Sequence, residues 1–179
     1  MRIIGGQWRG RRLKTPTWDG LRPTSDKLRE TLFNIIATRV PDARVLDVCA
    51  GTGAVGLEAL SRGAASAAFI DADRRAVALI DTNAELCGAR DRCVIIRDTA
   101  EHALHNRIDG DPFDLVMIDP PYEFTPLTPL IDNAALHLAA GGLLILEHAT
   151  RCTLPAFAAV TAMRTVRSGD SSLTLFAPR

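Results

Sequence analysis

The sequence predicts one α/β domain: a mostly parallel seven-stranded sheet with helices on both faces and an antiparallel last strand. Five short apolar segments alternate with stretches of helical periodicity, an order typical of parallel strands joined by crossover helices. Two further strand candidates follow with no helix between them, which favours an antiparallel pair at the end of the sheet. The chain has 179 residues, 47% of them hydrophobic, enough for one domain with a substantial core.

The first 23 residues are expected to form a basic extension of this domain. Glycines punctuate residues 1–13, a pattern that favours a β-hairpin, and prolines and glycines then interrupt regular structure. Thr24 and Ser25 are both good N-caps, so a helix is expected to begin here and to run to about Arg39. The predicted division is therefore an extension at 1–23 and a main domain at 24–179.

The remaining elements follow from short apolar runs and from helical spacing. The predicted strands are Arg44–Val48, Ala67–Asp71, Cys93–Arg97, Asp114–Asp119, Leu143–Glu147, Met163–Val166 and Leu173–Phe176. The predicted helices between the first five strands are Val55–Arg62, Arg74–Cys87, Thr99–Arg107 and Leu127–Leu138. A turn sequence at 168–171 connects the last two strands, so these are expected to form a hairpin.

Composition excludes several classes of protein. No apolar run approaches the roughly 20 residues of a membrane span, and no basic-then-apolar leader begins the chain, so a cytoplasmic protein is expected. The four cysteines form no C-x-x-C pair and accompany no histidine cluster, so no metal site is expected. Net charge is zero, but residues 1–30 carry about +5 and the remainder about −5. A basic segment on an acidic body is typical of a surface that meets a polyanion.

A glycine-rich loop follows the first strand of the main domain. Gly51, Gly53 and Gly56 satisfy the dinucleotide pattern G-x-G-x-x-G, and Asp71 ends the next strand 20 residues after the first glycine, so a dehydrogenase has to be considered. Asp47 argues against it, because a carboxylate just before the glycines would repel a pyrophosphate. The same carboxylate suits a cationic amino group, such as that of S-adenosylmethionine.

Two further strand ends carry acceptors that suit such a nucleotide-like ligand. Asp71 is placed to accept hydrogen bonds from ribose hydroxyls, and Asp98 from an adenine amino group. Each of these aspartates can equally serve as a helix cap or lie in a solvated turn. Asp73 is expected to cap the helix that begins at Arg74.

The fourth strand ends in Asp119-Pro120-Pro121-Tyr122. Two prolines fix φ, so the backbone carbonyls of this turn point in set directions. An exocyclic amine is a poor nucleophile, and acceptors from the Asp119 carboxylate and the Pro120 carbonyl would hold its N–H groups and favour a tetrahedral nitrogen. Tyr122 offers a ring on which a base can stack. Whether Asp119 takes a proton or only accepts a hydrogen bond stays open.

These motifs resemble those of a known family. The core resembles class I S-adenosylmethionine-dependent methyltransferases, in which D-P-P-Y is the signature of enzymes acting on amino groups. The specific resemblance, over nearly the whole chain, is to the RsmD type, which methylates guanine N2 in 16S rRNA. It is carried by Arg2-Ile3-Ile4-Gly5-Gly6, Trp8-Arg9-Gly10-Arg11, Leu21-Arg22-Pro23-Thr24, Arg29-Glu30-Thr31-Leu32-Phe33-Asn34 and the segment from Ala50 to Gly63. Cys49 and Thr52 depart slightly from the common loop sequence.

The resemblance implies a Rossmann-like monomer with an N-terminal β-hairpin, acting on the small ribosomal subunit without an obligate protein partner. Catalytic residues would be Asp119, Pro120, Pro121 and Tyr122. The cofactor, S-adenosyl-L-methionine, would be held by Asp47, Ala50, Gly51, Thr52, Gly53, Asp71, Ala72, Asp98, Thr99 and Asp119.

The basic extension is the predicted RNA-binding surface. Arginine and lysine side chains would contact phosphates, and Trp8 and Trp18 between them would stack on exposed bases. The alternatives are a merely solvated arm and a Trp8 that fastens the extension to the core. The predicted RNA-binding residues are Arg9, Arg11, Arg12, Lys14, Arg22 and Arg29.

Two rival functions remain. A DNA adenine-N6 methyltransferase would share the D-P-P-Y turn, but such enzymes usually carry a target-recognition insertion for which this chain has no room. A non-catalytic RNA-binding ribosome assembly factor would keep the fold without turnover, and the intact motifs speak against this.

Overall fold

The computed structural model describes residues 1–18, 25–121 and 124–179. Its strands are β1 (Arg44–Val48), β2 (Ser66–Asp71), β3 (Cys93–Arg97), β4 (Phe113–Ile118), β5 (Leu138–Ala149), β6 (Val160–Ser168) and β7 (Ser171–Pro178). Its helices are α1 (Asp26–Ile35), α2 (Ala54–Ser61), α3 (Arg74–Cys87), α4 (Ala100–Asn106) and α5 (Leu127–Ala135), with short 3-10 turns at Ala37–Arg39 and Arg90–Arg92.

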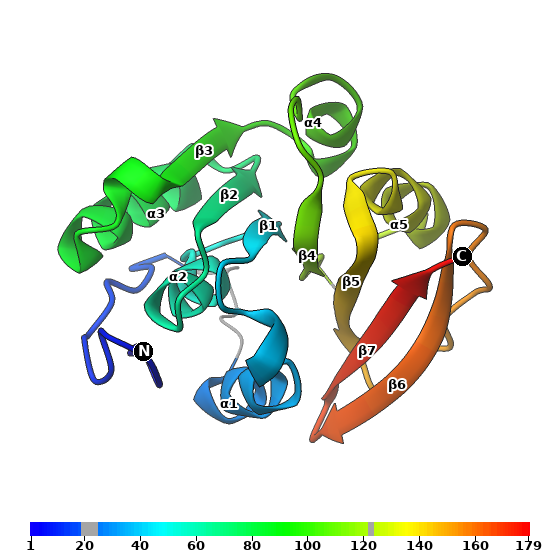
Figure 1. Ribbon diagram of the computed structural model, residues 1–179, viewed down its shortest axis with the longest axis horizontal. Helices are drawn as coiled ribbons and strands as arrows, with labels where there is room; N and C mark the ends of the chain where they lie inside the picture. The colour runs from blue at the N-terminus through cyan, green and yellow to red at the C-terminus, as the bar shows by residue number, and fades with distance from the viewer. Residues whose placement is uncertain (19–24, 122–123) are drawn as a thin grey trace.

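The seven strands form one sheet in the order β3-β2-β1-β4-β5-β7-β6 (Figure 1). Strands β1 to β5 are parallel, and β7 runs antiparallel to both β5 and β6. The predicted mostly parallel sheet with an antiparallel end is confirmed. Because β1 lies between β2 and β4, β2 and β3 extend to one side of it and β4 and β5 to the other, so the strand order reverses at this point.

Most element boundaries lie within a few residues of the predicted ones, and β1, β3 and α3 match them. Two differences have physical causes. The first helix ends at Ile35 and tightens into the 3-10 turn, so the predicted run to Arg39 is not one α-helix. Strand β5 begins at Leu138 instead of Leu143, because Leu138 pairs with Phe113 before a shift of register, and the strand continues through two glycines that read as a breaker.

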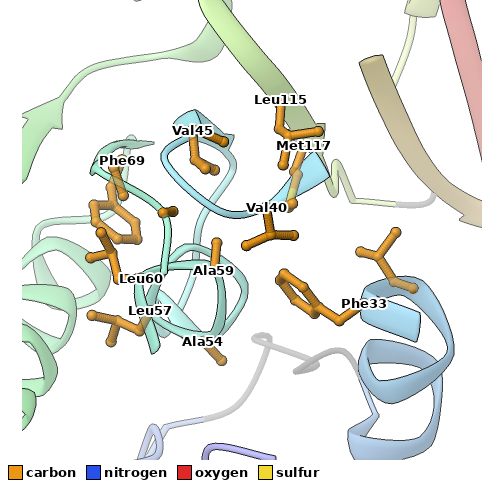
Figure 2. Close-up of a cluster of buried hydrophobic side chains, with 14 of the residues drawn as sticks. Phe33, Val40, Val45, Ala54, Leu57, Ala59, Leu60, Phe69, Leu115 and Met117 are labelled. Carbon is orange, nitrogen blue, oxygen red and sulfur yellow. The ribbon is translucent and has the colours of Figure 1, made fainter. Parts of the chain in front are cut away.

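Side-chain alternation divides the apolar residues between two hydrophobic clusters, one on each face of the sheet. Val45 of β1 belongs to the first cluster, with residues of α1, α2 and α3, whereas Leu46 belongs to the second, with residues of α4 and α5. Figure 2 shows part of the first cluster, in which side chains of α1 and α2 meet those of β1, β2 and β4. Helices therefore cover both faces, as predicted for parallel strands.

The N-terminal arm, defined here as residues 1–14, packs onto this framework beside α2 and α3 (Figure 1). The predicted β-hairpin is wrong in extent: the arm has a single antiparallel bridge, between Arg2 and Arg12, and no strands. The physical reason is that the backbone donors of Ile4 and Gly5 bond the Glu58 carboxylate of α2, each at 2.7 Å, instead of extending a ladder. Ile3 is fully buried in the first cluster.

Candidate active site at the carboxyl edge of the sheet

The predicted cofactor-binding and catalytic residues that the structure describes lie at or just after the carboxyl ends of four neighbouring strands, β3, β2, β1 and β4. Backbone hydrogen bonds continue past the strands and tie these ends together. The Ala50 N–H donates to Ile70 at 3.0 Å, that of Asp98 to Asp71 at 3.1 Å, and that of Asp119 to Val48 at 3.2 Å. Parallel strands thus bring the motifs together along one edge, the place where open α/β sheets bind their ligands.

The glycine loop, residues 49–53, turns sharply between β1 and α2. Its φ angles are positive at Cys49 (61°), Gly51 (56°) and Gly53 (73°). Asp71 of β2 fixes its shape, because one carboxylate oxygen accepts from the Gly51 N–H at 2.8 Å and the other from the Asp73 N–H at 2.9 Å. A carboxylate has about four acceptor positions. Asp71 therefore shapes the loop while keeping acceptor capacity for a ligand hydroxyl.

Asp47 lies beneath the first turn of α2 and is only 2% exposed. One of its oxygens accepts from the Gly56 N–H at 2.9 Å. A glycine is needed at that position, because a Cβ would lie 2.4 Å from the Phe69 ring and 3.3 Å from the Asp47 oxygen. Burial raises the pKa of Asp47 to about 7, with the Gly56 hydrogen bond opposing the rise and the charge of Asp71 adding to it. The carboxylate that supports the loop is therefore held at the border of ionisation.

We expect Asp47 to make the free energy of unfolding fall as pH rises. Its pKa is raised in the folded state, so the folded protein binds the extra proton between the unfolded pKa of 3.8 and about 7 and loses this stabilisation across that window. At about 1.4 kcal/mol per pKa unit, the loss amounts to about 4 kcal/mol. Asp47→Asn, which keeps an oxygen for Gly56, should remove it. Urea denaturation at pH 5 and pH 7.5 tests this, and parallel pH profiles of the two proteins would contradict it.

The end of β3 is occupied by a local hydrogen-bonded cluster. Asp98 accepts from the Thr99 N–H at 2.9 Å and pairs with His102 at 2.7 Å, and the His102 hydrogen bond lowers the pKa of Asp98. Thr99 is the N-cap of α4. On the neighbouring β2 loop, Ala72 is exposed and Asp73 caps α3, as predicted. Asp98 is therefore ionised and fixed in direction.

The Asp119-Pro120-Pro121 segment begins directly after β4. Asp119 is half-buried, Pro120 buried and Pro121 exposed, and the Pro121 carbonyl accepts from the Phe124 N–H at 2.8 Å. Tyr122 lies outside the described residues. Burial, with the charges of Asp71 and Asp119 adding to its effect, raises the pKa of the Cys49 thiol to about 12. Both carboxylates thus lie within electrostatic reach of the glycine loop.

The position of Arg29 contradicts its predicted role in RNA binding. Assigned by sequence to the RNA-binding surface, it is fully buried. Its guanidinium donates to the Arg2 carbonyl at 2.5 Å and to Asp26 at 3.0 Å, and it lies 3.7 Å from the Glu58 carboxylate. It shares the buried face of α1 with Leu28 and Leu32. The side chain therefore fastens the arm to the domain, a structural role that the sequence analysis missed.

The arm itself presents the expected basic surface in part. Arg9, Arg11, Arg12 and Lys14 are all exposed, although one Arg11 guanidinium nitrogen donates to the Leu86 carbonyl. Arg22 falls outside the described residues. Trp8 is half-buried against the first cluster with Arg92 over its ring at 5.2 Å, so the alternative in which it fastens the extension to the core is confirmed. Arg75 lies over the Trp18 ring at 4.8 Å.

Glu58 and Asn83 are the polar residues that the sequence analysis passed over, and both are fully buried. Glu58 bonds the arm and Arg62, and Asn83 bonds both the arm and the glycine loop. The available signal was position: each carries a polar side chain on the core-facing side of a helix, where a partner is obligatory.

Two negative observations hold for the described parts of the chain. In residues 1–18, 25–121 and 124–179, histidine, cysteine and acidic side chains form no group of three or more suited to a metal ion. Within the same ranges, no helix is both long and apolar enough to cross a membrane.

A cavity of about 430 Å³ adjoins the arm, lined by Met1, Arg2, Arg12, Leu13, Thr15 and Asp26.

Comparison with known proteins identifies relatives along the whole chain. The model of the family described as Conserved hypothetical protein 95 matches residues 1–177. Ribosomal RNA small subunit methyltransferase D of Escherichia coli is 48% identical over 123 residues, 68% of this chain and 60% of that protein. The chain thus matches less than two thirds of that relative's length. YlbH of Bacillus subtilis is 35% identical over 159 residues, 87% of this chain and 86% of that protein.

The fold matches solved structures equally well. The structure of yhhF from Escherichia coli superposes with a TM-score of 0.87 at 38% identity, covering 99% of this chain and 97% of that one. The Thermus thermophilus protein TTHA0928 superposes with a TM-score of 0.82 at 33% identity, covering 98% of each chain. The sheet and the N-terminal arm therefore belong to one shared architecture.

Proposed function

This chain belongs to the family described as Conserved hypothetical protein 95, that of ribosomal RNA small subunit methyltransferase D, and from this we propose that it methylates small-subunit rRNA. In this proposal a methyl group passes from S-adenosyl-L-methionine to the exocyclic N2 amine of a guanine. The observation that supports it best is the placement of the glycine loop and the Asp-Pro-Pro segment at the ends of two paired strands, with Val48 beside Ile118. The protein would act as a cytoplasmic monomer on the small ribosomal subunit.

The chemistry of the strand ends fits this cofactor. S-adenosylmethionine presents an ammonium group, ribose hydroxyls and an adenine amine, all of which donate hydrogen bonds, and the described edge offers carboxylate acceptors. Asp71 has acceptor capacity left, and Asp98 is held ionised by its histidine. A cationic ligand would favour the ionised form of Asp47. The proposed cofactor residues are Asp47, Ala50, Gly51, Thr52, Gly53, Asp71, Ala72, Asp98, Thr99 and Asp119.

The proposed catalysis is positioning and hydrogen bonding by the Asp-Pro-Pro-Tyr turn. When bound, the cofactor supplies an electrophilic methyl group. The Asp119 carboxylate and the Pro120 carbonyl accept the two amine N–H bonds, which favours a tetrahedral nitrogen with a directed lone pair. The Pro121–Phe124 hydrogen bond supports the stiffness of the turn. The amine proton leaves to Asp119 or to water, and the Tyr122 ring stacks on the extruded base.

The proposed RNA-binding extension comprises residues 1–23. Its first 14 residues combine exposed arginines with a docked backbone, so their charges are presented at fixed positions. Arg9 and Arg12 are exposed, and the second lines the cavity beside the arm. Phosphate contacts of this kind give affinity and register without reading the base. Recognition of one guanine would then come from the shape of the ribosomal substrate and from the Asp-Pro-Pro-Tyr turn.

Arg9→Gln with Arg12→Gln should weaken RNA binding in a salt-dependent way. Each lost phosphate contact should reduce the slope of log affinity against log salt by about 1, so the double variant should lose about 2. Cofactor affinity should stay unchanged, because neither residue contacts the glycine loop. The measurement is filter binding to small subunits at several salt concentrations, with Arg179→Gln near the end of β7 as the control. Unchanged salt slopes would remove these residues from the RNA surface.

The proposed function is tested by labelled methyl transfer from S-adenosylmethionine to undermethylated small subunits, with duplex DNA alongside and nucleoside analysis of the products. N2-methylguanosine in rRNA is the expected product. N6-methyladenine in DNA would establish the DNA enzyme instead. Cofactor binding without label in either substrate would indicate an assembly factor on an enzyme fold.

A further inference from the structure

One buried side chain connects the N-terminal arm to the glycine loop. Asn83 lies on α3 and is fully buried. Its amide oxygen accepts from the Lys14 N–H at 2.8 Å, and its amide nitrogen donates to the carbonyls of Lys14 at 3.1 Å and Thr52 at 3.0 Å. The arm and the loop are distant in sequence and meet here through a single amide.

The arrangement leaves little freedom for either partner to move alone. Backbone groups use both amide protons of Asn83 and one of its acceptor positions. If one of these backbone groups moved away, a buried polar atom of Asn83 would lose its hydrogen-bond partner with no water to replace it. A second contact also joins the glycine loop to the arm, since the Thr52 hydroxyl donates to the Met1 sulfur at 3.4 Å. Order in the loop therefore favours order in the arm.

We propose that Asn83 is a positioning residue that couples cofactor binding at the glycine loop to the docked position of the basic arm. A cofactor that orders residues 49–53 would hold Lys14, and with it the arm, against α3. By linkage, RNA bound to the arm raises cofactor affinity by the same factor, and such factors are typically about 5- to 150-fold. The inference rests on the proposed function for the identity of the two ligands.

Trypsin cleavage can measure how firmly the arm is docked, because the arm contains four exposed trypsin sites, Arg9, Arg11, Arg12 and Lys14. Limited digestion of the full chain with and without S-adenosylhomocysteine, followed by mass spectrometry, measures how fast these sites are cut. In the wild type the ligand should slow cleavage of the arm by about fivefold or more. In Asn83→Leu, which removes all three hydrogen bonds, the ligand should leave the cleavage rate unchanged.

Matched variants separate coupling from general instability. Ile131→Ala opens a cavity in the second cluster, beneath α5 and away from the arm, and should keep ligand protection despite its lower stability. Thr82→Ala changes the exposed neighbour of Asn83 on the same helix and should behave as wild type. Asn83→Asp keeps the acceptor for Lys14 and serves as the second variant should the leucine protein not fold. Loss of protection in Ile131→Ala as well would overturn the assignment to Asn83.

Wild-type calorimetry gives a test that needs no variant. The affinity for S-adenosylhomocysteine is measured alone and with saturating small subunits, and an increase of about fivefold or more is expected. Ligand binding with neither an affinity change nor protection of the arm would overturn the coupling and leave the proposed function intact. Absence of any binding of S-adenosylmethionine or S-adenosylhomocysteine would overturn both. Equal protection in the wild type and both Asn83 variants would show that the coupling bypasses this residue.

Discussion

Asp119→Asn should reduce methyl transfer by about 10²- to 10³-fold, the range measured when one preorganised hydrogen-bonding group is removed from an active site. The variant keeps the shape of the side chain and the backbone bond to Val48 but presents an amide in place of one carboxylate oxygen. An amide N–H facing an amine N–H repels the group that the carboxylate would hold. Cofactor affinity should change by less than about tenfold, since the other proposed cofactor residues are unaltered.

The measurement is single-turnover transfer of labelled methyl to small subunits, with cofactor affinity from calorimetry. Asp114→Asn is the matched control: the residue lies near the other end of β4, is exposed, and accepts from the Arg44 N–H at 2.8 Å. Its rate should stay within about twofold of wild type, because substitutions at exposed sites away from special features are usually small in effect. Wild-type turnover by the Asp119 variant would refute the proposed chemistry.

Gly6→Ala should undock the N-terminal arm. Gly6 has a φ of +76°, and a Cβ there would lie 1.8 Å from the Ser61 carbonyl oxygen, so backbone has to move. Movement breaks the bonds from the Gln7 N–H to Ser61 at 2.8 Å and from the Trp8 N–H to the Ser61 hydroxyl at 3.0 Å. Overpacking of about 1–3 kcal/mol, two lost hydrogen bonds of about 1 kcal/mol each and a left-handed alanine at about 1–2 kcal/mol predict a loss of about 4–7 kcal/mol in unfolding free energy.

Gly10 provides an internal control for this substitution. Its φ is also positive, at +85°, but a Cβ there would meet no atom within 4 Å. Gly10→Ala carries only the conformational cost of a left-handed alanine, about 1–2 kcal/mol. Urea denaturation of both variants separates the clash from the backbone preference. Equal destabilisation of the two would show that the contact of Gly6 with α2 does not hold the arm.

The sheet and its functional edge were predictable because the relevant signals are local. Each of the strands β2 to β4 is a short apolar run with an aspartate at or just beyond its end, and the parallel order then brings Asp71, Asp98 and Asp119 to one edge. The pairing of β1 with β4, which places the glycine loop beside the Asp-Pro-Pro segment, was not predicted and comes from the structure.

The docking of the arm was not predictable because its partners are distant and individually unusual. A charged residue such as Arg29 is expected on the surface, and its burial is tolerable because Asp26, the Arg2 carbonyl and Glu58 of another helix compensate the charge. The hairpin was overestimated for the same reason: glycine spacing shows where the chain bends but not that a carboxylate from α2 takes the backbone donors of Ile4 and Gly5. Asn83 likewise reveals its role only when both of its backbone partners are in place.

The docking of the arm also sets an order of folding during synthesis. Residues of the arm bond groups 53 to 75 positions later in the chain, on α2 and at the end of α3. The arm therefore has no binding surface until that much more polypeptide has emerged, and closing so long a loop is slow compared with helix formation. During this interval the basic segment is an unfolded tail, which makes it the part of the nascent chain most open to proteases and to stray polyanions.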